Sequence, residues 1–301
     1  MKKPRAQGER FLTPDFLRRL EHLSVASRFR VEGSRTGSHR SPLKGLSTEF
    51  ADHRQYVIGD DLKRLDWKVY ARNERYYVKQ YEESTNLRAY LMVDRSASMK
   101  FGSNGQSKFE YACQLAAGLA YVITKQQDNA GLVLFSRKID QYIPPGSSAL
   151  HLRAMLDALA ETEPSDRTEA ATALHGAADR IHRRGLIFVL SDLLDDQDAV
   201  MRGLAHFRQK QHDVIVFHIL DDAELNLPYD QITTFRDMET GDQIRVSPRD
   251  MKRDYADRIA SFIQSYRKAC FDSNIDYAQI NTATPCATFL AAYLNQRTRT
   301  R

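Results

Sequence analysis

Residues 87–99 read LRAYLMVDRSASM and join an apolar strand to a polar loop. The first part, Leu87–Val93, is mostly apolar and predicts a buried β-strand. Directly after this strand, Asp94, Ser96 and Ser98 stand at alternate positions. One carboxylate and two hydroxyls at this spacing direct hard oxygen ligands into one small volume, which is the arrangement that a divalent cation needs. The stretch therefore predicts a buried strand with a metal-binding loop at its end.

Two later residues fit the same cluster. Asp192 stands at the end of the apolar run Leu186–Leu190, and Thr168 opens a helical segment. In open parallel sheets ligands collect outside the carboxyl ends of the strands, where we expect Asp94 and Asp192, and Thr168 lies in a loop that can reach them. Asp and Ser after strands also serve as helix caps and turn formers, so the first loop alone leaves a structural interpretation open. The two additional residues favour a metal site, and oxygen ligands without His or Cys favour Mg²⁺, Mn²⁺ or Ca²⁺ over zinc.

Strands and helices alternate from residue 87 onward. Continuously apolar strands separated by amphipathic helices are typical of an α/β fold with a doubly wound, mostly parallel sheet and helices on both faces. After Asp222 the pattern changes to a hairpin signal, residues 232–235 and 243–246, followed by a long helical stripe from Tyr255 to Cys270. The expected strands of the main sheet are residues 87–93, 131–135, 186–190, 213–220 and 275–280, with 139–143 as a short edge strand.

The chain of 301 residues is long enough for one large domain with attachments. We expect residues 1–44 to be a basic leader and linker, and residues 45–86 to be an N-terminal subdomain that is both charged and aromatic. Residues 87–222 form the α/β core in this division. Residues 223–301 add the hairpin, the long helix and a final strand and helix that complete the domain. Within the subdomain we expect Trp67, the only tryptophan, to be a core anchor.

The net charge of +5 is concentrated near the start of the chain. Residues 1–45 hold 11 Lys or Arg against 4 Asp or Glu, whereas the remainder holds 33 against 35. A basic leader suits nucleic acid, anionic lipid or an acidic protein, but solvated and partly disordered arms commonly have the same composition. Within it, Thr13 and Pro14 predict the start of a short helix that runs to Leu23.

Composition also argues against several classes of protein. No run of about 18 apolar residues exists, and the first residues lack the apolar segment of a signal peptide. The cysteines Cys113, Cys270 and Cys286 are odd in number, far apart and without metal or redox spacing. We therefore expect a cytoplasmic protein with no membrane span, disulfide framework or zinc site.

The cluster of Asp94, Ser96, Ser98, Thr168 and Asp192 resembles the metal-ion-dependent adhesion site of von Willebrand factor A domains. The resemblance implies a von Willebrand factor A-like core. It also implies that the two serines and the threonine ligate the ion directly, whereas the two aspartates act mostly through water. In such domains a carboxylate from a partner fills the open coordination position, so the ion bridges an interface.

A second, more specific resemblance lies upstream of the cluster, and together the two resemblances cover about residues 45–295. This upstream block resembles the family called domain of unknown function 58, whose members are bacterial and are typically encoded beside MoxR-type AAA+ ATPases. The partners that the resemblance implies are such an ATPase, a protein ligand that presents Asp or Glu, or both. The residues that carry it are Glu49, Phe50, Arg54, Tyr56, Gly59, Asp60, Asp61, Arg64, Asp66, Trp67, Ala71, Arg72, Val78 and Lys79.

Two positions depart from the adhesion-site pattern: Ala97 and Leu193 stand where many such domains have glycine. The chain has no Ser–His–Asp order with supporting motifs, no Gly-rich phosphate loop and no ligand spacing among its nine His. We therefore expect an interaction protein rather than an enzyme. The alternatives are a magnesium-dependent hydrolase acting on phosphate esters and, less favoured, a nucleic-acid-binding protein that uses the basic leader.

Overall fold

The computed structural model describes residues 7–27, 39–40, 49–57, 65–73, 75–82, 84–165, 169–238 and 241–299. The contacts within the chain divide it into two compact units. The larger unit combines residues 1–28 with residues 88–301, and the smaller unit consists of residues 29–87. The residues of the expected metal site belong to the larger unit.

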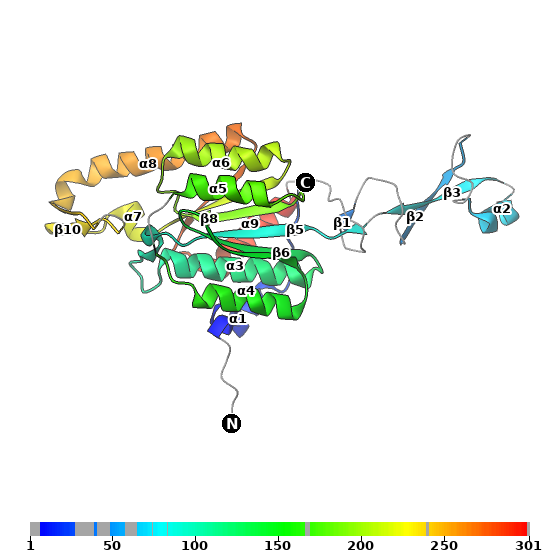
Figure 1. The fold of residues 1–301 in the computed structure, drawn as a ribbon, viewed down its shortest axis with the longest axis horizontal. Helices are drawn as coiled ribbons and strands as arrows, with labels where there is room; N and C mark the ends of the chain where they lie inside the picture. The colour runs from blue at the N-terminus through cyan, green and yellow to red at the C-terminus, as the bar shows by residue number, and fades with distance from the viewer. Residues whose placement is uncertain are drawn as a thin grey trace, which may run out of the picture. The chain divides into compact units, whose positions relative to one another are not determined.

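A six-stranded sheet forms the centre of the larger unit (Figure 1). Its strand order is β12-β9-β8-β5-β6-β7, and every neighbouring pair is parallel except β6 and β7. The central strands are buried along almost their whole length, as expected where both faces of a parallel sheet are covered. The expected α/β architecture is confirmed, including the edge strand β7 and the late strand β12. The strands are β5 (Arg88–Asp94), β6 (Asn129–Phe135), β7 (Ile139–Gly146), β8 (Leu186–Ser191), β9 (Asp213–Leu220) and β12 (Asp276–Asn281).

Helices cover both faces of this sheet: α5 and α6 lie on one face, and α3 and α4 lie on the other (Figure 1). The helices are amphipathic, so each turns one apolar stripe to the strands; α6, for example, buries Val200, Leu204 and Phe207 at helical spacing. Among the described residues, no helix has both the length and the apolar character that crossing a membrane requires. The long helices are α3 (Lys108–Lys125), α4 (Ala149–Glu161), α5 (Ala170–Arg180), α6 (Gln197–Gln209), α8 (Pro248–Asp272) and α9 (Cys286–Arg299).

The first described residues pack against the helices of the larger unit, to which they belong. A short 3₁₀ helix, η1 (Gln7–Phe11), contacts α3 and α4, and α1 (Pro14–Leu20) contacts α3 and α9. The predicted helix start is confirmed, because the Thr13 side chain caps α1 by accepting from the Phe16 amide at 3.3 Å. Burial of Phe16 and Leu20 corrects the expectation of a solvated arm for this part of the leader, since the apolar side chains of α1 complete the core.

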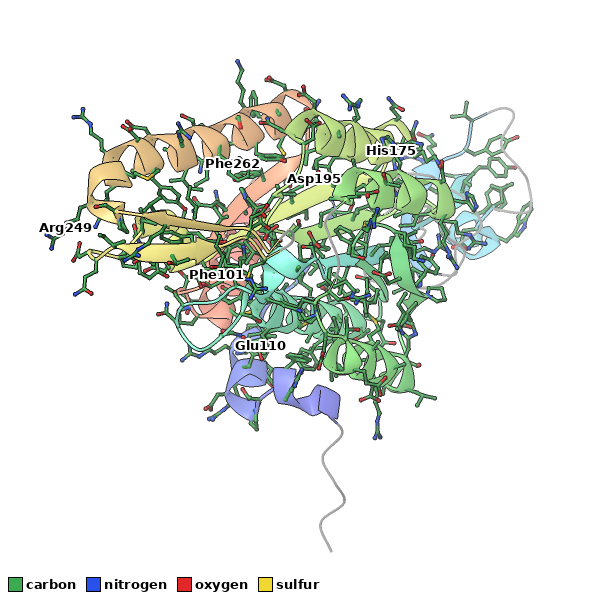
Figure 2. All side chains as sticks on the ribbon, turned by 60° about the vertical axis from the view of Figure 1, so that its left-hand side comes forward. Phe101, Glu110, His175, Asp195, Arg249 and Phe262 are labelled. Carbon is green, nitrogen blue, oxygen red and sulfur yellow. The ribbon has the colours of Figure 1, made fainter. Side chains whose placement is uncertain are left out.

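A hairpin extends the larger unit after β9. A short helix, α7 (Asp222–Asn226), leads to β10 (Thr233–Arg236) and β11 (Gln243–Val246), which pair antiparallel as the sequence predicts. Pro248 then starts α8. In Figure 1 β10 and α7 lie together beside the first turns of α8. Figure 2 shows Arg249 at this end of α8.

The described residues of the smaller unit form two antiparallel strand pairs and one helix. β1 (His39–Arg40) pairs with β4 (Ser84–Thr85), and β2 (Glu49–Gln55) pairs with β3 (Tyr77–Glu82), which confirms the extended strand expected at residues 77–81. The helix is α2 (Trp67–Asn73).

The aromatic residues of this unit partly contact one another. The rings of Tyr70 and Tyr76 stack with their centroids 4.5 Å apart, and Trp67 meets the edge of Tyr70. The Trp67 side chain is 60% exposed, so the expectation of a buried core anchor is wrong. The first position of α2 turns its ring outward. Of the upstream motif, Gly59–Asp61 and Arg64 lie outside the described residues.

Candidate metal centre

The loop after β5 brings three of the expected ligands together. Asp94 ends β5, and Ser96 is the N-cap residue of a short 3₁₀ helix, η3 (Ala97–Lys100), which contains Ser98. The Asp94 Oδ1 atom accepts from the Ser96 amide at 2.9 Å, and the Oγ atoms of Ser96 and Ser98 lie 3.0 Å apart. All three side chains are buried. The alternate spacing in the sequence thus gives one carboxylate and two adjacent hydroxyls.

Asp192 reaches the same edge of the sheet because β8 runs parallel to β5 and lies beside it. The residue directly follows β8, so it stands at the carboxyl end of its strand as Asp94 does. Burial and the negative charge of Asp192 raise the pKa of Asp94 to about 7, against the effect of hydrogen bonds from Ser191 and Ser96. Two buried carboxylates therefore face an electrostatic cost that a cation between them would relieve.

Thr168, the fifth expected ligand, lies outside the described residues. The chain on either side of it is attached to the two loops of the cluster. The Ser165 amide donates to the Arg95 carbonyl at 2.8 Å, and the Ala170 amide donates to Asp195 Oδ2 at 2.8 Å. The flanking residues are thus held at the loop after β5 and at the loop after β8.

Lys108 supplies a positive charge that the sequence analysis did not anticipate. Its side chain is fully buried, and Nζ donates to Asp192 Oδ2 at 2.8 Å and to Glu224 Oε1 at 2.6 Å. Burial acts to lower the pKa of Lys108, but the two carboxylates outweigh it and raise this pKa above its ordinary value. One sequence signal was available: a lysine at the first position of a helix opposes the helix dipole, which points to a carboxylate partner.

Ser191 and His218 support the two aspartates. Ser191 Oγ donates to Asp94 Oδ2 at 2.6 Å. His218 Nε2–H donates to the Asp192 carbonyl at 2.9 Å, while its Nδ1 accepts from the Tyr277 hydroxyl at 2.6 Å. Burial lowers the pKa of His218 to about 4, so the ring is neutral. The sequence carried no signal for this pair, because only the β8–β9 register places Ser191 opposite His218.

The two departures from glycine are accommodated differently. Ala97 is buried in η3. Leu193 has a φ of 53°, in the left-handed region that favours glycine. Its amide donates to Ser191 Oγ at 3.0 Å, its carbonyl accepts from the Tyr266 hydroxyl at 3.1 Å, and its side chain joins the core. The loop therefore keeps a conformation typical of glycine with a leucine in it.

The donor set fits a hard divalent cation. The converging atoms are carboxylate and hydroxyl oxygens, which Mg²⁺, Mn²⁺ and Ca²⁺ prefer. Over the described residues, no group of three or more His, Cys, Asp or Glu side chains could hold a metal ion. An ion at this edge would therefore depend on the hydroxyls of Ser96 and Ser98 as well as on the negative charge of Asp94. Lys108 already engages one oxygen of Asp192.

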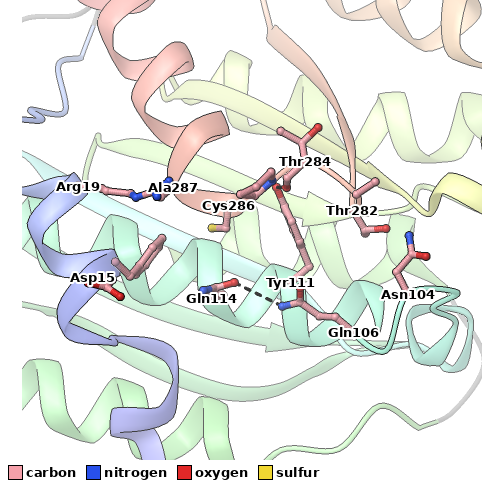
Figure 3. Close-up of a pocket in the computed structure, with 13 residues that line it drawn as sticks. Asp15, Arg19, Asn104, Gln106, Tyr111, Gln114, Thr282, Thr284, Cys286 and Ala287 are labelled. Carbon is pink, nitrogen blue, oxygen red and sulfur yellow. Dashed lines mark hydrogen bonds between the residues drawn. The ribbon is translucent and has the colours of Figure 1, made fainter.

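Two cavities lie at this end of the unit. One, of about 360 Å³, is lined by Ser98 and by apolar side chains that include Phe101, Leu194 and Phe235. Figure 2 shows Phe101 close to the hairpin. The other, of about 630 Å³, lies between α1, α3 and the start of α9 (Figure 3) and includes Tyr111. Only the smaller of these two adjoins the serine cluster.

A family model described as "Protein of unknown function DUF58" matches residues 52–262. This range covers well over half of the chain and includes the loops after β5 and β8. The chain belongs to the DUF58 family. The expected family resemblance is thereby confirmed, and Lys108 and Glu224 lie inside the matched range as well.

Two relatives of this DUF58 chain are described as uncharacterized proteins. Uncharacterized protein Rv1480 from Mycobacterium tuberculosis is 26% identical over 233 residues, which cover 76% of this chain and 72% of the relative. Uncharacterized protein YeaD from Bacillus subtilis is 28% identical over 114 residues, covering 38% of this chain and 26% of the relative. The crystal structure of conserved hypothetical protein BatB from Bacteroides thetaiotaomicron aligns with a TM-score of 0.48 at 15% identity, covering 71% of this chain and 100% of that chain.

Proposed function

We propose that this protein is a metal-dependent interaction adaptor with a von Willebrand factor A-like core. The observation that carries the proposal is the convergence of Asp94, Ser96 and Ser98 at the sheet edge where Asp192 also lies. In this proposal the two serines and Thr168 hold Mg²⁺, or Mn²⁺ or Ca²⁺, and the two aspartates act mostly through water. A bound ion supplies an open coordination position that accepts an acidic side chain of a partner protein.

The surroundings of the cluster support a protein partner. The 360 Å³ cavity beside Ser98 is lined largely by apolar side chains, and its rim includes Leu194 and Met238, which are 44% and 45% exposed. Exposed apolar side chains next to a polar anchor are typical of interaction surfaces. The family resemblance adds the kind of partner, so we propose a MoxR-type AAA+ ATPase, a protein ligand presenting Asp or Glu, or both.

The double variant Asp94→Asn with Ser96→Ala tests the proposal. Asn preserves the size of the Asp94 side chain: its Oδ1 can still accept from the amide of residue 96, and its NH₂ group can donate to Ser191 Oγ. The negative charge of Asp94 and the hydroxyl of Ser96 are lost. Calorimetric titration with a purified MoxR-type AAA+ ATPase is expected to show binding in MgCl₂ and none in EDTA. The double variant should bind at least about tenfold more weakly in MgCl₂, a loss of about 1.4 kcal/mol.

Ser136→Ala is the matched control. Ser136 is buried just after the neighbouring strand β6 and bonds to Asp140, outside the serine cluster. Loss of the Ser136 hydroxyl should leave the magnesium-dependent binding of the ATPase unchanged. Binding of the ATPase that is equal in EDTA and MgCl₂, or equal for the wild type and the folded double variant, would refute the metal-dependent mechanism.

A further inference from the structure

Lys108 is the feature of the site that a simple oxygen-ligand cluster does not explain. Its ammonium group is completely enclosed, and lysine is almost never fully buried unless it is paired. It comes from α3, whereas its two carboxylate partners come from the loop after β8 and from α7: Asp192 at 2.8 Å and Glu224 at 2.6 Å. Three separate segments of the chain are therefore joined by one cation.

This cation occupies one oxygen of a carboxylate that belongs to the proposed metal site. Asp192 Oδ2 accepts from Lys108, and Asp192 Oδ1 lies 3.3 Å from the Leu194 amide that donates to it. Within the described part of the chain, no basic side chain bonds to Asp94: its oxygens accept from the Ser96 amide and the Ser191 hydroxyl. An ammonium group thus balances the negative charge at Asp192, whereas the described residues place no such group on Asp94.

Another buried basic residue shows what a purely structural pair looks like in this protein. Arg297, in α9, bonds to Asp213 and Asp276, the first residues of β9 and β12. These lie at the amino ends of the strands, opposite the carboxyl ends where the candidate site lies. No expected ligand is in that group. Lys108 differs because one of its carboxylates is an expected metal-site residue whose charge also raises the pKa of Asp94.

We propose that Lys108 is a built-in competitor for the divalent cation: it holds the Asp192 carboxylate, repels a second positive charge, and so sets the concentration at which the site fills. The inference rests on the proposed metal site but on no particular partner. Two positive groups that share one carboxylate weaken each other's binding, and the repulsion between them is strong because the site is buried.

The test compares wild-type protein with Lys108→Met, which has a side chain of similar length without the charge. Calorimetric titration with MgCl₂ and with MnCl₂, in the absence of any partner, is expected to show at least about tenfold tighter binding by the variant. Thermal unfolding should show that the metal-free variant is less stable than the wild type, because two carboxylates lose their cation, and that MgCl₂ restores more stability to it.

Two further variants keep the test decisive. Lys108→Met with Glu224→Gln removes one charge of each sign and serves if the single variant does not fold; it too should bind the ions more tightly than wild type. Lys100→Met is the matched control, because Lys100 is an exposed lysine in η3 near the cluster. The affinity of this variant for Mg²⁺ and Mn²⁺ should stay within about twofold of wild type.

The outcomes separate this inference from the proposed function. Tight binding by the Lys108 variants with no measurable binding by wild type would support the competitor and would count against a metal-dependent adaptor. Equal affinity in wild type and the folded variants, weaker affinity in the variants, or no ion binding by any of them would overturn the inference. If wild type and variants bind the ions with equal affinity and partner binding still depends on the metal, the inference about Lys108 fails and the proposed function is retained.

Discussion

Leu193 shows how neighbouring groups hold a single residue in an unfavourable conformation. A left-handed backbone costs an ordinary L-residue about 1 kcal/mol or more, and glycine avoids that cost. Here the backbone makes hydrogen bonds to Ser191 and Tyr266, and the side chain is 1% exposed within the core. Burial of the leucine side chain therefore offsets the backbone cost and fixes the loop that carries Asp192.

This balance predicts an unusual order of stability for two variants. Leu193→Ala should lower the free energy of unfolding by about 2–5 kcal/mol, because it keeps the strained φ and loses the buried side chain. Leu193→Gly should cost about 1 kcal/mol less than the alanine variant, because the strain is relieved. Urea denaturation measures both values.

Leu190 is the matched position for comparison. Leu190 is equally buried, but it lies within β8 and its φ is not positive. There the glycine variant should be less stable than the alanine variant by about 0.5–1 kcal/mol. The same order at both positions would contradict the role given to Leu193.

His218 makes stability depend on pH. Its folded-state pKa of about 4 lies below the ordinary value of 6.5, so the unfolded chain binds the proton more readily between these values. The neutral ring contributes stability that is fully present above pH 6.5 and is lost as the pH falls to 4. The stability lost over that range is about 3 kcal/mol, on the order of 1.4 kcal/mol per pH unit.

The variant His218→Gln isolates this contribution. Glutamine can donate to the Asp192 carbonyl and accept from Tyr277 but does not titrate here. The stability advantage of wild type over the variant, measured by denaturation in EDTA, should shrink between pH 7 and pH 4. Neighbouring titratable groups, namely Asp192 and Lys108, are present in both proteins. A constant difference across this range would show that His218 does not titrate as described.

At the scale of elements, α1 is the part whose role the sequence left open. Its helical start was predictable from Thr13 and Pro14, but its docking was not, because seven residues with several charges read as a solvated segment. Docking depends on Gly118 in α3: a Cβ atom there would come within 2.9 Å of both Phe16 and Leu290. The absence of a side chain at this position allows α1 and α9 to approach α3 closely.

Phe16→Ala measures how much α1 contributes. The Phe16 ring is 4% exposed, so its removal should lower the free energy of unfolding by about 3 kcal/mol. Phe271→Ala is the control, since Phe271 on α8 is 81% exposed and its loss should change stability by less than about 0.5 kcal/mol. Chemical denaturation of both variants would give the comparison, and equal effects would mean that α1 does not belong to the cooperative core.

At the scale of the whole molecule, sheet topology assembles the candidate site. The order β12-β9-β8-β5-β6-β7 places β5 and β8 side by side, so that residues 94 and 192, nearly a hundred positions apart, share one edge. Helix α3, which comes between β5 and β6, brings Lys108 to that edge, and α7, which follows β9, brings Glu224. Each of these segments was predictable as an element, yet their convergence depends on the register of parallel strands.

The sequence by itself determined the α/β class, the strands and the serine loop after β5, because hydrophobic period and local spacing are properties of neighbouring residues. Only the tertiary structure decided that Lys108 binds Asp192, that Ser191 and His218 support the aspartates, and that Trp67 is exposed. The physical reason is that such contacts join residues far apart in the chain. Their partners are selected by packing and strand register, and one-dimensional patterns do not record either.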